Sequence, residues 1–204
     1  MRPLDAAWVR VAVPDHMAEI VATLSHLARQ SPQINQSSGV SVRLTVSNTE
    51  TLVANAMRRS LRHGETEVVP RGSDLEALAS STVGKVEIES LEEGRDGQII
   101  ENLVKAAVLT VFRERFSPEK LREVIGAFDG EVVVNAGDDI AAAAYADLVA
   151  SVPALREPIG RLTGGDESPA AAASAVEFIL EGLHLSKRLN KEAVGGRATY
   201  RGRR

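Results

Sequence analysis

The chain has 204 residues, of which 44% are hydrophobic and 25% are charged, a balance typical of a soluble globular protein. It contains no cysteine, which excludes a disulfide framework, a thiolate zinc site and cysteine nucleophile chemistry. No apolar run approaches the roughly 20 residues of a membrane helix, and the start lacks the long apolar region of a signal peptide, so we expect a cytoplasmic protein with no membrane partner.

The formal net charge of −4 is unevenly distributed along the chain. Residues 187–204 contain seven basic residues and one acid, so this segment carries +6 and the rest of the chain −10. A basic tail can bind nucleic acid or acidic lipid, but it is also typical of a solvated terminus. We adopt the second interpretation and predict a flexible basic tail over residues 193–204. We also predict no nucleic-acid partner, because Tyr200 is the only tail aromatic that could stack on bases.

The first predicted helix begins at Asp15, a good N-cap, and ends before Ser31-Pro32. After a polar loop, Ser47 and Glu50 have the spacing of a capping box, which predicts a long helix that ends near Gly64. Residues 41–46 are then a separate helical turn or are fused to the same helix.

The second half of the chain also has helical periodicity. Residues 99–116 form a strongly apolar helical pattern, and Ser168-Pro169 predicts the start of a long helix that runs to about Lys191. Residues 131–137 have strand propensity but no evident partner, so we interpret them as an extended connector. Together these elements predict an all-α fold.

The sequence contains no complete catalytic or metal-binding motif. The nearest match to a phosphate-binding loop, residues 79–86, lacks the first glycine, ends in valine and follows a helix instead of a strand. The four histidines do not have the spacing of metal ligands, so we predict no metal site.

One arginine stands out within the stretch SGVSVRLTVSNTE, residues 38–50. Arg43 lies among small and apolar residues, so its guanidinium must either turn towards water, pair with an acid at the start of a helix, or bind an anion.

The sequence around Arg43, LARQSPQINQSSGVSVRLTVSNTETLVANAMRRSL, resembles the C-terminal helical lid of magnesium-chelatase-like AAA+ ATPases, a group close to the MoxR-type ATPases. The later pieces VPRGSDLEAL, GKVEIES and LHLSKRLNK are similar to one bacterial branch of that group. The resemblance extends from about Val13 to about Tyr200 and is most specific at SGVSVR. It implies that Arg43 is the sensor-2 residue, which reaches the γ-phosphate of ATP bound to the ATPase core.

The chain departs from this family because no phosphate loop, Walker B strand, sensor 1 or arginine finger precedes the lid. It therefore resembles the C-terminal portion of such an ATPase: a truncated gene product, a product of a wrongly assigned start, or a separate lid-bearing protein. ATP and Mg²⁺ are implied for the complete ATPase only, and the implied partners are the AAA+ core and neighbouring subunits of a homo-oligomeric ring. We expect the chain alone to be inactive as an enzyme.

The resemblance implies a division of the chain into four parts. These are a leader (1–13), a lid-type helical bundle (14–82), a helical extension (83–192) and the basic tail (193–204). The alternative function is a non-enzymatic adaptor that binds a partner through the long helices of residues 98–191 and does not need Arg43.

Overall fold

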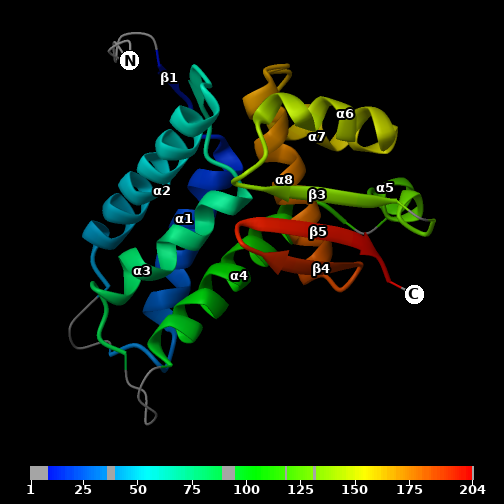
Figure 1. Ribbon diagram of the computed structural model, residues 1–204. Coiled ribbons are helices and arrows are strands. Elements are labelled where there is room, and N and C mark those ends of the chain that lie inside the picture. The colour runs from blue at the N-terminus through cyan, green and yellow to red at the C-terminus, as the bar shows by residue number, and fades with distance from the viewer. Residues whose placement is uncertain (1–8, 36–39, 89–94, 118, 131, 204) are drawn as a thin grey trace.

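The fold was obtained as a computed structural model, and the structure describes residues 9–35, 40–88, 95–117, 119–130 and 132–203. Long helices occupy one side of the molecule, and a small antiparallel sheet crosses the other side in front of the last helix (Figure 1). Ser38 and Gly39 of the SGVSVR motif lie outside the described residues, whereas the rest of the motif, including Arg43, lies within them.

Two helices form the N-terminal side. α1 (Asp15–Gln30) ends before Ser31, as the sequence predicts, but its N-cap is Pro14, and Asp15, the predicted N-cap, is instead the first helical residue. α2 (Val42–His63) begins five residues before the predicted Ser47 cap, because the Ser41 side chain caps the helix instead. The turn over residues 41–46 is therefore fused to the long helix, and Gly64 ends it in a left-handed conformation with φ of 69°.

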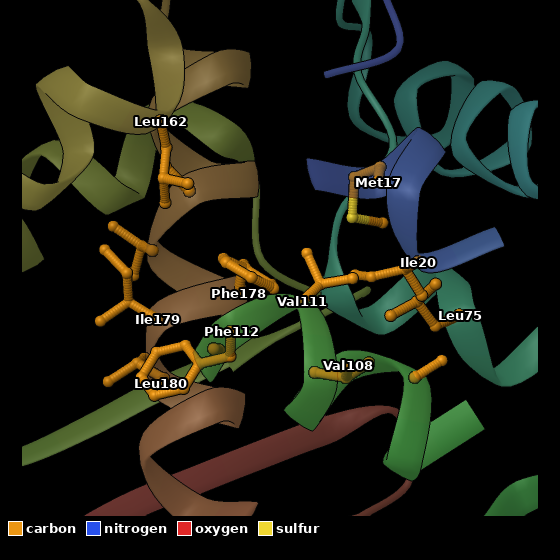
Figure 2. Packing of buried hydrophobic residues seen from close by; sticks show 14 of the residues in the cluster. Met17, Ile20, Leu75, Val108, Val111, Phe112, Leu162, Phe178, Ile179 and Leu180 are labelled. Atoms are coloured by element: carbon orange, nitrogen blue, oxygen red, sulfur yellow. The ribbon is translucent and has the colours of Figure 1, made fainter. Parts of the chain in front are cut away.

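The long helices α4 (Asp96–Arg115) and α8 (Pro169–Leu185) carry most of the remaining core. The rings of Phe112 and Phe178 meet edge to face with centroids 5.9 Å apart, next to Met17 of α1 (Figure 2). A Cβ atom at Gly182 would collide with the Phe112 ring, so α8 can approach α4 this closely only with glycine at this position.

Shorter elements connect these helices. They are η2 (Gly72–Glu76), α3 (Ala77–Val83), α5 (Arg122–Ala127), η3 (Ala142–Ala144), α6 (Tyr145–Ser151), η4 (Pro153–Leu155) and α7 (Arg156–Thr163).

The predicted all-α fold is wrong, because the chain also contains two small sheets. In the first, β1 (Arg10–Val11) pairs in parallel with β2 (Glu67–Val68). In the second, β5 (Arg197–Gly202) lies between β3 (Val133–Gly137) and β4 (Leu189–Val194), and both pairings are antiparallel.

The three-stranded sheet replaces structure that the sequence assigned to a helix and a tail. α8 ends at Leu185, short of the predicted Lys191, and Lys187 turns the chain with a left-handed φ of 60°. Gly195 and Gly196, with φ of 58° and 82°, form the turn between β4 and β5. Residues 197–202, which we assigned to the basic tail, supply the partner that β3 lacked in the sequence.

The hydrophobic core is continuous from Met17 to Tyr200. It includes side chains from residues 14–82 and from residues 83–192, so these two segments pack against each other through one shared core.

Candidate functional site

Arg43 lies in the first turn of α2 and its side chain is exposed. Its backbone N–H donates to Ser41 Oγ at 3.2 Å, which fixes the backbone while leaving the guanidinium free. Within the described part of the chain, the Arg43 side chain makes no hydrogen bond or ion pair, and the first turn of α2 contains no acid. The start of α2 therefore combines the positive end of a helix dipole with an unneutralised guanidinium.

Contacts from α1 hold the start of α2 in place. Arg29 Nε donates to the carbonyl oxygen of Val40 at 3.0 Å, and Thr45 Oγ1 donates to Ser25 Oγ at 2.8 Å. Leu44, which follows Arg43, is buried in the core. The backbone that carries Arg43 is thus attached to α1 on both sides of the residue, although the side chain itself points to solvent.

Exposed apolar side chains accompany Arg43 along α2. Val42 is 71% and Val46 is 52% exposed, and Met57 and Leu61 extend the apolar surface towards the other end of the helix. We call Val42, Val46, Met57 and Leu61 the α2 stripe. Large exposed apolar side chains along one helix are typical of an interaction surface, and here they lie on the same element as the exposed guanidinium of Arg43.

The opposite end of α2 carries a second arginine in a very different environment. The Arg59 side chain is 2% exposed, and its guanidinium binds both carboxylate oxygens of Asp74 at 3.0 and 3.3 Å. It also donates to Glu65 at 3.3 Å and to the carbonyl oxygen of Val69 at 2.8 Å. Burial opposes the charged form of Arg59, but the hydrogen bonds and charge of Asp74 outweigh this effect and raise the pKa of the guanidinium.

We did not predict from the sequence that Arg59 is a buried charge. Its position carried a signal, since Arg59 follows the buried Leu52 and Ala56 at helical spacing and therefore lies on the apolar face of α2. A charged residue on such a face needs partners, but the sequence does not show that Asp74 provides them.

A second buried arginine links η2 to the C-terminal half. Arg71 is fully buried, and its Nη2 donates to the carbonyl oxygens of Gly137 and Ile140 at 2.7 and 2.6 Å. Its Nε lies 3.1 Å from Glu177 Oε1 on α8, and the guanidinium lies over the Tyr145 ring, 5.2 Å from the centroid. Arg71 therefore ties three separate segments together.

Glu177, on α8, joins Arg71 and Tyr145 in one buried network. It accepts hydrogen bonds from the Ser73 backbone N–H at 2.6 Å and from the Tyr145 hydroxyl. Burial, together with the charge of Glu177, raises the pKa of Tyr145, so this hydroxyl stays protonated as a donor. Because these charges are buried and paired with protein groups, we interpret the network as structural and not as a reactive site.

His16 forms another buried polar contact. Its Nε2 lies 3.2 Å from Ser174 Oγ, and Ser174 donates to the carbonyl oxygen of Pro70 at 2.6 Å. Burial, reinforced by the charge of Arg115, lowers the pKa of His16 to about 3. His16 is therefore neutral at physiological pH and connects α1 to α8.

A cavity of about 680 Å³ lies between η2, α4, α8 and the inner face of the three-stranded sheet. Three of its polar residues are already engaged, since Glu181 accepts from Lys191 at 2.8 Å and from the Tyr200 hydroxyl at 2.7 Å. Arg43 does not line this cavity. The structure thus does not bring the residue that the sequence singled out together with the cavity or the buried network.

The structure places the other features considered in the sequence in ordinary roles. Residues 79–86 span the end of α3 and the turn after it. His63 and His184 contact backbone carbonyl oxygens at 2.8 and 3.2 Å. In the described ranges no three His, Asp or Glu side chains gather in a group that could hold a metal ion.

No family model matches the chain, and neither the curated proteins nor the solved structures include a significant match. Among the described helices, none has both the length and the apolar character needed to cross a membrane.

Proposed function

We propose that this chain is the C-terminal lid portion of a magnesium-chelatase-like AAA+ ATPase of the bacterial cytoplasm, and that Arg43 contributes a sensor-2 contact to nucleotide held by a separate core. The proposal depends on the resemblance of residues 27–61 to that lid. The observation that supports it best is the environment of Arg43, an exposed guanidinium without a described partner at the start of a long, firmly attached helix.

The chemistry of Arg43 suits this role. A guanidinium is always charged at physiological pH and presents a planar set of donors that match phosphate oxygens. Near a transferring phosphoryl group it would stabilise the charge that develops on the equatorial oxygens. The α2 stripe would pack against the body that carries the phosphate and so bring Arg43 to it.

The test compares ATP turnover by the chain alone, by the chain co-expressed with a phosphate-loop core of the same family, and by the Arg43→Ala variant of that complex. We expect no turnover from the pure chain. In the complex we expect Arg43→Ala to lower kcat by about 100-fold or more, as for the loss of one oxyanion donor. Arg58→Ala is the matched control, since Arg58 is an exposed arginine on the same helix.

Three results would contradict the proposal. They are measurable ATP hydrolysis by the pure chain, no turnover when the unmodified chain is combined with a family core, and unchanged turnover in the Arg43→Ala complex.

The second candidate function, a non-enzymatic adaptor, finds support in the α2 stripe. The apolar faces of α4 and α8, which we first considered as the adaptor surface, are buried in the chain's own core. An adaptor would therefore use α2. Affinity capture with Arg43→Ala separates the two functions, because an adaptor keeps its partner, whereas a lid loses its nucleotide-dependent contact.

A further inference from the structure

The three-stranded sheet has one face turned to the core and one to solvent. Strand alternation sends the Tyr200 side chain inwards, where it is buried, and sends Arg197 and Arg201 outwards, where they are exposed. Thr199 lies between these arginines on the same face and donates to Asn135 Oδ1 of β3 at 2.9 Å. The outer sheet face consists of the side chains of Val133, Asn135, Asn190, Glu192, Val194, Arg197, Thr199, Arg201 and Arg203.

The arginines of the outer sheet face stand in a line. Alternate residues of a strand are about 7 Å apart, and Arg203 continues the line beyond the end of β5. Arg203 donates to the carbonyl oxygen of Lys187 at 2.9 Å, which brings the exposed Lys187 and Arg188 to the same end of the sheet. Five described cations of the basic segment, Lys187, Arg188, Arg197, Arg201 and Arg203, are therefore exposed on an ordered surface rather than spread over a flexible tail.

Two acids partly neutralise this surface. Arg197 pairs with Asp139 at 2.6 Å, and Arg201 pairs with Glu192. All four side chains are at least 38% exposed. Ion pairs this exposed contribute little to stability and are easily exchanged for another anion. Five cations against these two acids leave the surface with a charge of about +3 among the described residues.

We propose that the outer sheet face binds the phosphodiester backbone of single-stranded nucleic acid. A line of guanidinium groups complements a linear polyanion, and the Thr and Asn side chains between them are of the type that contacts phosphate and sugar. Tyr200 faces the core and cannot stack on bases, so binding rests on charge and has no sequence preference. This inference does not depend on the ATPase proposal, and it reverses our expectation from the sequence.

The test measures fluorescence anisotropy of a labelled 20-nucleotide oligothymidine with the full chain at 50 and 200 mM salt. With about three phosphates neutralised, we expect affinity to fall roughly 20-fold between these salt concentrations. The double variant Arg197→Glu/Arg201→Glu should lose binding at 50 mM salt. The control Arg58→Glu/Arg113→Glu makes the same charge change at exposed positions of α2 and α4 and should keep it.

The single variant Arg201→Lys, which preserves the charge, provides a measurement if the double variant fails to fold by circular dichroism. It should retain binding within about threefold, whereas Arg201→Ala should weaken binding and reduce the salt slope by about 0.7. Absence of binding at 50 mM salt would overturn the proposal, and so would equal loss in the α2/α4 control. Binding to phosphatidylglycerol vesicles without any binding to the oligonucleotide would also overturn it, in favour of a membrane surface.

Discussion

The two ends of α2 carry arginines in opposite environments. Arg43 is exposed and has no described partner for its guanidinium, whereas Arg59 is buried and binds Asp74, Glu65 and a backbone carbonyl. They are about 24 Å apart along one helix at a rise of 1.5 Å per residue. The same type of side chain is therefore exposed at one end of α2 and buried in ion pairs at the other.

The difference shows that the surroundings of an arginine decide whether its donors are used within the chain or stay exposed to solvent. The charge of Arg59 is satisfied by groups of its own chain, so it fixes the position of α2 relative to η2. The donors of Arg43 are unused by the described residues, so they are free for a ligand or partner. Arg59 should consequently contribute strongly to folding stability, and Arg43 should contribute little to it.

The largest expected effect on the free energy of unfolding comes from removing the buried Arg59 side chain. Arg59→Ala leaves the Asp74 carboxylate buried without its main partner, and removal of one partner of a buried ion pair costs about 3–5 kcal/mol. Urea denaturation should show this loss, while Arg58→Ala, the exposed neighbour, should change the unfolding free energy by less than about 0.5 kcal/mol. A loss below about 1 kcal/mol for Arg59→Ala would refute the structural role of the Arg59–Asp74 ion pair.

A smaller effect should follow acidification, through the buried His16. The native pKa of His16 is about 3 and its usual value is 6.5, so between these values the unfolded chain binds a proton that the native state excludes. This contribution to stability is fully present above pH 6.5 and is lost as pH falls, by about 1.4 kcal/mol per unit, or roughly 2 kcal/mol at pH 5.

The His16→Leu variant isolates this contribution. Its unfolding free energy, measured at pH 7 and pH 5, should fall by roughly 2 kcal/mol less than that of the unmodified chain, because leucine does not titrate. An identical fall in both proteins would show that His16 is not excluded from protonation in the native state.

The smallest expected effect on stability is at the exposed end of α2. Arg43→Ala should change the unfolding free energy by less than about 0.5 kcal/mol, since no described side chain depends on the guanidinium. In the complex with an ATPase core that we propose, Arg43→Lys should recover only part of the turnover lost in Arg43→Ala, because lysine keeps the charge but not the planar set of donors. A destabilisation above 1 kcal/mol would mean that Arg43 has a structural role.

Several helix boundaries could be predicted from local sequence. Ser168 caps α8 by accepting from the Ala171 N–H at 3.2 Å, and Pro169 follows at the first helical position, as expected. α1 ends before Ser31 for the predicted reason. The sequence left open whether residues 41–46 belong to α2, because both Ser41 and Ser47 are competent caps, and the attachment of residues 40–45 to α1 favours Ser41.

The sheet could be predicted only in part. Two adjacent glycines at 195 and 196 are a recognised hairpin turn signal, and residues 197–201 after them alternate as a strand does. We interpreted the segment as a tail because its charge resembled a solvated terminus. The pairing of Val134 with Tyr200 joins residues that are distant in sequence, and no local pattern specifies such a pairing.

The sequence by itself determined the helical periodicity, the start of α8 and the end of α1, since these depend on residues within a few positions of one another. Only the tertiary structure decided that Arg59 and Arg71 are buried ion-pair centres and that the basic segment forms a strand with its arginines in line. Partners such as Asp74, Glu177 and β3 come from other parts of the chain, and their contacts exist only once the fold brings them together.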